Sequence, residues 1–156
     1  MPRRFESIEI SIATEATDEL VAAFGRMIPQ LSASAAPPDS KTLIEVIGTS
    51  SNTLLLARDR EHQHKIIGTL TLVVLRIPTG IRAWIEDVVV DAAARGRGAG
   101  EALTREAIRL ASERGAQTID LTSRRSREAA HKLYEKVGFT LRETSVYRFV
   151  GPRTAH

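Results

Sequence analysis

The chain has 156 residues, of which 42% are hydrophobic and 26% are charged, a composition typical of one globular domain with a proper core. It contains no cysteine, which excludes disulfides, thiolate catalysis and thiolate metal ligands. Residues 1–75 carry 7 basic and 9 acidic side chains, whereas residues 76–156 carry 15 basic and 10 acidic, so the net charge of +3 arises in the second half. That half favours an anionic ligand, while an aromatic content of only 4% argues against nucleic acid.

The sequence pattern also argues against a membrane or secreted protein and against a metal site. No apolar run reaches the roughly 18 residues of a membrane span, and Met1–Glu9 lacks the apolar region of a signal peptide, which predicts a cytoplasmic protein. The histidines have no spacing typical of metal ligands, and His62 and His64 lie in a polar turn, so no metal is expected. The other two histidines are His131 and His156.

The first half of the chain predicts one strand, two helices and a hairpin. Isoleucines at alternate positions indicate a strand at 8–13, and Thr14 or Thr17 can cap the helix that follows. The apolar residues of this helix fall at helical spacing: Leu20, Ala23, Phe24, Met27 and Ile28. After a Ser/Pro loop at 32–40, a short helix is expected at 42–47. Two apolar runs joined by a charged turn predict a hairpin with strands at 53–57 and 65–75.

The second half predicts a central strand at 82–90, followed by alternating helices and strands. The next helix ends near Gly115 and has one apolar face: Ala99, Leu103, Ala107, Leu110 and Ala111. A short strand is expected at 118–121. The last helix, at 127–137, has four residues predicted to face inward: Ala130, Leu133, Tyr134 and Val137. Two closing strands are expected at 139–141 and 146–150, and residues 1–156 are interpreted as a single domain without repeats.

The glycine-rich turn after the central strand is the most informative segment. It places three glycines at alternating positions, with arginines between them, immediately before an amphipathic helix: Arg95, Gly96, Arg97, Gly98 and Gly100. Glycines allow successive backbone N–H groups to point into one concavity, and the helix start adds further N–H groups and positive dipole charge. The segment therefore predicts a cradle for phosphate groups, although a plain flexible turn has the same composition.

The spacing of these glycines distinguishes this turn from two common phosphate-binding motifs. It differs from the G-x-G-x-x-G dinucleotide motif, and no Gly-Lys-Ser/Thr follows as in a P-loop. The pattern Arg95-x-x-Gly98-x-Gly100 resembles the pyrophosphate-binding motif of the GNAT family of acetyl-CoA-dependent N-acetyltransferases. The segment from Ala130 to Phe139 is similar to the A-x-x-L-Y-x-K-x-G-F pattern of the same family. The order of elements also resembles the GNAT fold, which implies an α/β architecture: a mixed, mostly antiparallel sheet of about seven strands flanked by about four helices.

The resemblance implies a set of contacts to acetyl-CoA or CoA as cosubstrate. Backbone groups of Val88, Val89 and Val90 are expected to hold its pantetheine arm. The pyrophosphate is expected on the segment formed by Arg95, Gly96, Arg97, Gly98, Ala99, Gly100 and Glu101. Arg127 stands where many family members have Asn, and a cation there could contact CoA or an anionic acceptor. Together with Arg124 and Arg125 it is equally consistent with a solvated surface.

The same resemblance assigns two catalytic roles. Glu86 is the candidate base, acting directly or through water, and a structural carboxylate is the alternative. Asp87 lies on the opposite face of a regular strand, and a bulge would exchange the roles of the two. Tyr134 matches the tyrosine that in many relatives donates a proton to the CoA thiolate, with a core aromatic as the alternative.

The acceptor and the assembly stay open at this point. Either a small-molecule amine or a protein amine fits, and the strand Ile85–Val90 resembles that of glucosamine-6-phosphate N-acetyltransferases. A non-catalytic CoA-binding module and a basic nucleic-acid-binding domain are the other classes. Because free sheet edges invite pairing, the terminal strands favour a homodimer.

Overall fold

A computed structural model describes residues 5–152; the first residues of the segment inspected for a signal peptide, and His156, lie outside the described residues. One five-stranded sheet has the order β1-β2-β3-β4-β5, in which only the β4–β5 pair is parallel. The strands are β1 (Ile8–Ile12), β2 (Asn52–Asp59), β3 (Lys65–Ile77), β4 (Gly80–Val90) and β5 (Thr118–Asp120). The helices are α1 (Asp18–Leu31), α2 (Ser40–Gly48), α3 (Ala99–Glu113) and α4 (Glu128–Val137), with a 3-10 turn η1 (Ala92–Ala94).

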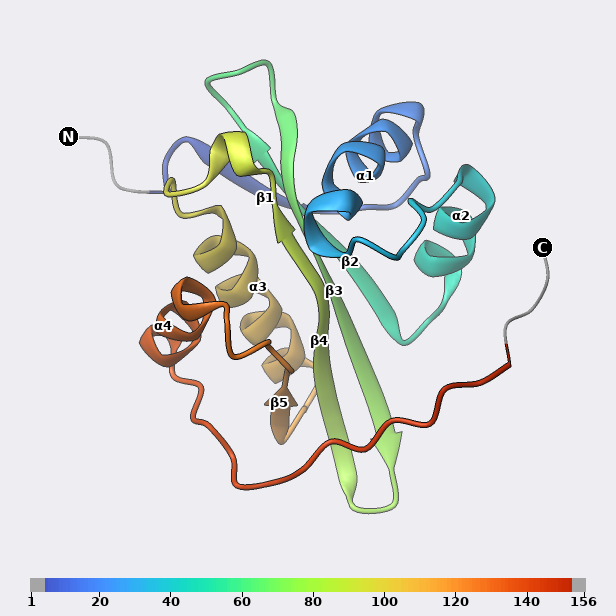
Figure 1. The fold of residues 1–156 in the computed structure, drawn as a ribbon, viewed down its shortest axis with the longest axis vertical. Coiled ribbons are helices and arrows are strands. Elements are labelled where there is room, and N and C mark those ends of the chain that lie inside the picture. The colour runs from blue at the N-terminus through green and yellow to red at the C-terminus, as the bar shows by residue number, and fades with distance from the viewer. Residues whose placement is uncertain (1–4, 153–156) are drawn as a thin grey trace.

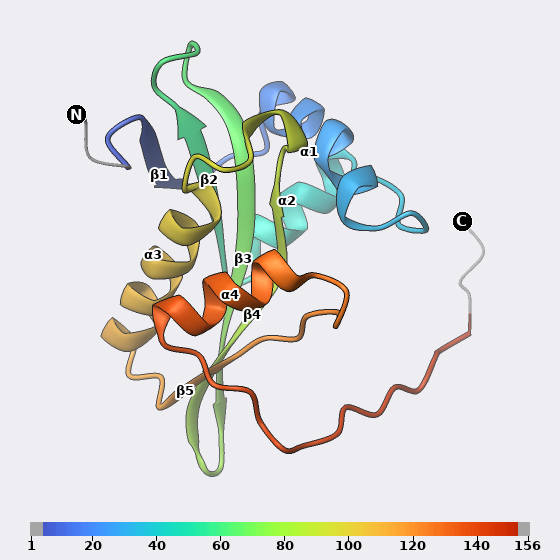
Figure 2. The same cartoon turned by 60° about the vertical axis from the view of Figure 1, so that its left-hand side comes forward.

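The helices cover the two faces of this sheet in pairs. Figures 1 and 2 show α1 and α2 on one face and α3 and α4 on the other. Side chains alternate along each strand, so β2 contributes Leu54 and Leu56 to the α1 side, and Leu55 and Ala57 to the α3 side. The result is two hydrophobic clusters, one on each side of the sheet.

Most of the predicted elements are confirmed within one or two residues. Thr17, rather than Thr14, caps α1, because its side chain accepts a hydrogen bond from the Leu20 N–H at 3.1 Å. The hairpin of β2 and β3 forms as expected, and the predicted apolar face of α3 is buried throughout. Within residues 5–152, no helix is both long enough and apolar enough to traverse a bilayer.

The prediction of two closing strands at 139–141 and 146–150 is wrong. Residues 139–152 form no strand, and the sheet has five strands instead of about seven. The reason is physical: a strand exists only when its backbone pairs with a neighbour, and this segment meets no sheet edge among the described residues. The inward side chains of α4, Leu133, Tyr134 and Val137, are consequently half-buried rather than buried.

Candidate functional site

The sheet opens beside the C-terminal half of β4. β5 pairs with β4 only from Arg82 to Trp84, and beyond this point the chain leaves the sheet and turns towards α4 (Figure 2). The backbone of β4 from Ile85 to Val90 therefore has a sheet neighbour on its β3 side alone. Buried peptide groups need hydrogen-bond partners, so this open edge suits a ligand that carries amides of its own. It contains Val88, Val89 and Val90, the residues predicted to hold a pantetheine arm.

A β-bulge interrupts β4 at its carboxylate pair. Thr71 pairs with Glu86 and Thr69 with Val89, so three steps on β4 oppose two on β3. Asp87 is the inserted residue, with φ of +49° in the left-handed region that Asp tolerates better than most residues. Before the bulge Ile85 faces the α3 side, so alternation places Glu86 on the α1 side of the sheet.

The bulge also defines the electrostatics of the pair. Partial burial of its carboxyl raises the pKa of Glu86, and the negative charge of Asp87 raises it further. Both residues remain accessible to solvent. A carboxylate with a raised pKa is a better proton acceptor than an ordinary one. The inserted residue is Asp87 and the strand alternates regularly up to Glu86, so the bulge does not exchange the two roles and Glu86 remains the candidate base.

The glycine turn forms a cradle at the start of α3. Gly96 and Gly98 have φ of +81° and +92°, which a residue with a Cβ adopts only with strain. Gly98 is the N-cap of α3 and offers no side-chain cap. The first helical hydrogen bond of the backbone runs from Ala102 N–H to Gly98 C=O at 3.0 Å, so the N–H groups of Ala99, Gly100 and Glu101 precede it without helical acceptors. These amides make the predicted site for a pyrophosphate.

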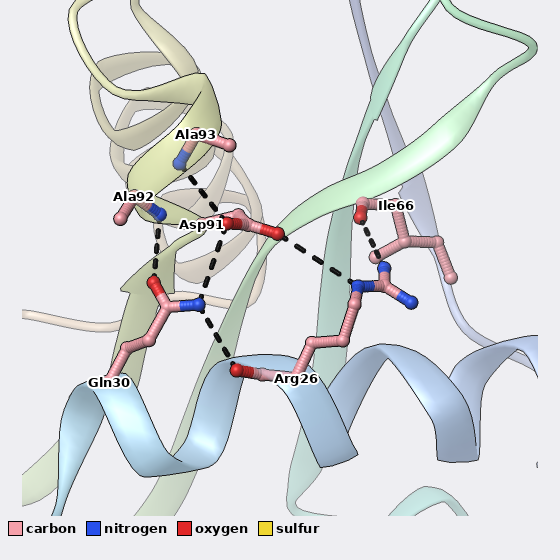
Figure 3. A network of polar contacts seen from close by, with 6 residues as sticks. All are labelled: Arg26, Gln30, Ile66, Asp91, Ala92 and Ala93. Atoms are coloured by element: carbon pink, nitrogen blue, oxygen red, sulfur yellow. Dashed lines mark hydrogen bonds and ion pairs between the residues drawn. The ribbon is translucent and has the colours of Figure 1, made fainter.

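A polar network fixes the approach to this cradle from the other side of the sheet (Figure 3). Asp91, directly after β4, caps η1 by accepting from Ala93 N–H at 3.2 Å. Gln30 of α1 accepts from Ala92 N–H at 2.7 Å and donates to Asp91 at 3.5 Å. Arg26, also on α1, lies 3.9 Å from Asp91 and donates to the Ile66 carbonyl. The last turns of α1 therefore hold the segment that leads from β4 into the cradle.

Arg97 anchors the cradle to the end of β2. Its guanidinium donates to Asp59, which is 2% exposed and is also bonded by His62 Nδ1 at 2.7 Å and by the Glu61 N–H. Burial alone would raise the pKa of Asp59, but the hydrogen bonds from Arg97 and His62 outweigh it and hold the pKa below its ordinary value. The side chain of Arg97 is thus engaged within the protein, and its backbone N–H is the group left for the predicted contact with a pyrophosphate.

The cluster of Asp59, Glu61 and His62 also has the spacing of a cation site, with one ligand atom from each lying within 4.8 Å of the others. The carboxylate oxygen of Asp59 that faces His62 already accepts the guanidinium of Arg97. A positive side chain at that oxygen opposes the binding of a metal ion there.

Tyr134 lies on α4, half-buried on the α3 side of the sheet. Its ring packs edge to face on Phe139, with centroids 5.9 Å apart. Burial raises the pKa of the phenol, while the nearby charge of Arg127 lowers it in part, so Tyr134 keeps its proton at neutral pH. Arg127 is the N-cap of α4 and donates to the Leu31 carbonyl at the end of α1, 3.2 Å away. This contact joins the helices of the two faces, and the exposed Arg124 and Arg125 make no comparable one among the described residues.

A buried carboxylate holds α4, and with it Tyr134, against the start of α3. Glu101 is 5% exposed and accepts from Lys136 Nζ at 2.9 Å and from Arg105 Nε at 3.1 Å. The sequence assigned a role only to the backbone of Glu101. The buried position of its side chain was indicated only by its place three residues before Thr104, on the side of α3 that becomes buried. Leu133 reinforces the junction, because a Cβ added at Gly100 would lie 3.3 Å from it.

The ion pairs of Glu101 with Lys136 and Arg105, which we call the Glu101 clamp, predict an acid-dependent loss of stability. The hydrogen bond from Lys136 lowers the pKa of Glu101 below 4.5 despite its burial. A carboxyl with a lowered folded-state pKa stabilises the fold above its unfolded pKa, and this contribution disappears as the pH falls through the folded value. We expect Glu101→Gln to lower the free energy of unfolding by about 1–3 kcal/mol at pH 7, and the deficit to shrink towards pH 3.

Urea denaturation across this pH range measures the effect. Glu113→Gln is the matched control, because Glu113 pairs with Arg109 on the same helix but is 62% exposed. An exposed pair of this kind contributes about 0.5 kcal/mol or less. A deficit for Glu101→Gln that stayed constant from pH 7 to pH 3 would contradict the clamp.

A separate cavity of about 370 Å³ lies away from these residues. It is lined by parts of β1, α2 and β2 and by Arg114, the C-cap of α3, at the opposite end of that helix from the cradle. Neither Glu86 nor Tyr134 borders it. The predicted site residues gather instead along β4, the cradle and α4.

Comparisons with known proteins bear on the family and the fold. The sequence matches the model of the acetyltransferase (GNAT) family over residues 17–139. No curated protein matches it. A transcriptional regulator from Bacillus halodurans is 28% identical, with a TM-score of 0.72 and coverage of 92% of this chain and 99% of that one.

Two similar structures are named for their acceptors. An aminoglycoside acetyltransferase from an uncultured soil metagenomic sample is 20% identical with a TM-score of 0.77, covering 96% of this chain and 99% of its own. Glucosamine-6-phosphate N-acetyltransferase from Arabidopsis thaliana is 19% identical with a TM-score of 0.77, covering 94% of this chain and all of its own (100%). At these identities the likeness concerns the fold.

Proposed function

The chain belongs to the GNAT acetyltransferase family, and on that premise we propose that it transfers an acetyl group from acetyl-CoA to a primary amine. The observation that supports this most directly is the continuity of the open edge of β4 with the cradle at the start of α3. An elongated ligand with amides at one end and a diphosphate at the other matches both in order. Glu86 lies on this strand, and Tyr134 on the helix that packs against the cradle.

The residues present fit the chemical groups of acetyl-CoA. The unpaired β4 edge at Val88–Val90 offers hydrogen-bonding groups to pantetheine amides, and the N–H groups of Ala99 to Glu101 offer donors to the pyrophosphate. Hydrogen bonds to a charged acceptor contribute roughly 1.5–3 kcal/mol each, so the cradle can bind without a lysine. Arg95, exposed beside it, adds positive charge.

The transfer itself requires protons to leave the amine nitrogen and one proton to reach the departing sulfur. An amine with a pKa of about 10.4 costs about 4.6 kcal/mol to deprotonate at pH 7, and Glu86, directly or through water, accepts that proton. The amine nitrogen then forms the bond to the thioester carbonyl carbon as the carbon–sulfur bond breaks. The departing CoA sulfur takes a proton from Tyr134, and the acetylated nitrogen loses its surplus proton to solvent, from which Tyr134 regains one. Glu86 releases its proton to solvent, so that amide, free CoA and an intact enzyme result.

Three compounds test which kind of amine the protein acetylates. Two structural relatives act on amino sugars by name, and Glu86 with Asp87 places negative charge where a cationic amine would arrive. We therefore begin with an aminoglycoside, glucosamine-6-phosphate and a lysine-containing peptide, and follow CoA release at millimolar acceptor. If the protein binds acetyl-CoA but releases no CoA with any of many amines, the non-catalytic CoA-binding module is favoured. Failure to bind acetyl-CoA, with salt-sensitive DNA binding, would favour the nucleic-acid-binding domain.

The pH profile of the carboxylate pair tests the mechanism. We expect Glu86→Gln to lower kcat about 10- to 100-fold near pH 7, with a smaller deficit at higher pH where the amine deprotonates unaided. The wild-type profile should fall on its acid side as Glu86 takes up a proton, at a pH above 4.5 because its pKa is raised.

Asp87→Asn is the matched variant, because Asn also tolerates the positive φ of the bulge. Its loss of charge should move the acid limb to lower pH while activity at pH 8 stays close to that of the parent. The reverse pattern, a large loss for Asp87→Asn and none for Glu86→Gln, would give the base role to Asp87.

A further inference from the structure

The only tryptophan of the chain, Trp84, lies on β4 two residues before Glu86. Its neighbours Ala83 and Ile85 face the α3 side. Alternation therefore places Trp84 on the α1 side of the sheet, the same face as Glu86. The Trp84 side chain is half-buried and packs against neither hydrophobic cluster. An aromatic ring of this size outside the core offers a flat apolar surface to a ligand.

The sheet narrows to two strands where Trp84 lies. β2 pairs with β3 only as far as Asn52 with Val73, and Val73 is also the register partner of Trp84. Beyond this pair, β3 and β4 continue as a hairpin whose end projects past α1 and α2 (Figures 1 and 2). The ring of Trp84 therefore lies at the border of the helix-covered part of the sheet, in agreement with its partial exposure.

Two carboxylates flank Trp84 on the same face. Asp120 of β5 is its register partner, and the partners before it, Ala83 and Ile119, both pack on the α3 side. Asp120 is half-buried, and Glu86 lies two residues beyond Trp84 on β4. Their Cα atoms are about 8 Å apart, from two residues of about 3.3 Å along the strand and about 4.8 Å between strands. Neither carboxylate forms an ion pair within residues 5–152.

On the premise of acetyl transfer to an amine, we propose that Trp84 and Asp120 select an acceptor with two ammonium groups roughly 6–9 Å apart. Glu86 receives the reacting amine, and Asp120 pairs with the second ammonium. The carbon skeleton between the two lies on the Trp84 ring, whose face attracts cations as the carboxylates do. The chemistry is that of a diammonium ion, with either an aliphatic chain or a sugar as the skeleton.

Arg82 argues against an amino sugar phosphate as the acceptor. It precedes Trp84 by two residues on the same face, and its guanidinium donates to the hydroxyls of Thr79 at 3.2 Å and Thr118 at 3.5 Å. These bonds hold the cation at the hairpin end of the strand, four residues or about 13 Å from Glu86. A phosphate on the same sugar as the reacting amine does not span that distance. The charge within reach of such an acceptor is the carboxylate of Asp120.

Fluorescence of Trp84 measures acceptor binding without turnover, because the chain has no other tryptophan. Titrations in the absence of acetyl-CoA compare 1,5-diaminopentane with 1-aminopentane, which has the same carbon chain and one amine. We expect the diamine to change the emission with an affinity about 10-fold higher, since its second ammonium gains the contact with Asp120. A tighter response to an aminoglycoside identifies a sugar as the skeleton. Equal affinities for the two pentyl amines, or tighter binding of glucosamine-6-phosphate, overturn the proposal.

Asp120→Asn tests the assignment of the second ammonium. We expect it to remove the advantage of the diamine and to leave the binding of 1-aminopentane unchanged, with circular dichroism and acetyl-CoA binding as in the parent. Glu45→Gln, which neutralises an exposed carboxylate on α2, is the matched control and should keep the advantage. An Asp120→Asn variant that still prefers the diamine about 10-fold contradicts the role of Asp120.

Turnover separates this inference from the proposed function. We expect Asp120→Asn to raise the KM for the diamine about 10-fold, with kcat and the KM for 1-aminopentane close to those of the parent. Trp84→Leu should raise the KM for both amines, and unchanged values overturn the role of the ring. If no amine releases CoA while the emission still favours the diamine, the transfer fails and the diammonium site stands. If both amines react with equal KM in the parent, the transfer stands and the diammonium site fails.

Discussion

Gly98→Asp is expected to abolish acetyl-CoA binding while leaving the protein folded. Gly98 is the N-cap of α3, where an Asp side chain accepts hydrogen bonds from the first-turn N–H groups. The new carboxylate would occupy the donors intended for the pyrophosphate and would repel it. Losing two charged hydrogen bonds, at roughly 1.5–3 kcal/mol each, weakens binding by at least about 100-fold. Calorimetric titration with acetyl-CoA and with CoA measures this loss.

Two substitutions at the same position separate the causes. Gly98→Asn can occupy the same N–H groups without a charge, so we expect an intermediate loss of about 10-fold. Gly98→Ala tests only the strain of a Cβ at φ of +92°, which costs about 1 kcal/mol of stability and should change binding least. If Gly98→Asp binds as tightly as the parent, the cradle is not the pyrophosphate site.

The features that the sequence predicted well depend on neighbours along the chain. The cradle needs only glycines at Gly96 and Gly98 and a helix that starts at once, and local spacing reveals both. The faces of α1 and α3 follow from helical periodicity in the same way. Their burial therefore agrees with the pattern almost residue by residue.

The features that the sequence missed depend on distant partners. The bulge at Asp87, which the sequence offered only as an alternative, follows from the register between β3 and β4, and the Arg97–Asp59 pair joins residues 38 positions apart. The Glu101–Lys136 clamp likewise depends on how α4 packs on α3. The closing strand 146–150 has strong strand propensity, but propensity does not supply the edge that a strand must pair with.

Tyr134→Phe is expected to lower kcat by about 100-fold with little change in the KM for acetyl-CoA. The substitution keeps the ring and its edge-to-face contact with Phe139, so the fold is retained. It removes only the proton that the departing thiolate receives, and a positioned general acid contributes typically 10²–10⁴-fold. A variant with unchanged kcat would leave Tyr134 as a core aromatic.

The second tyrosine of the chain supplies both the control and a direct measurement. Tyr147 is 93% exposed in the segment that follows α4, and Tyr147→Phe should leave kcat unchanged. In that background Tyr134 is the only tyrosine, so ultraviolet absorption follows its ionisation alone. Because burial raises the pKa of Tyr134, its phenol should ionise above pH 10, and any alkaline fall in kcat that tracks this ionisation would identify the phenol as the acid. Replacing Arg127 with Met removes a charge that lowers this pKa, so ionisation and the alkaline limb should move together to higher pH.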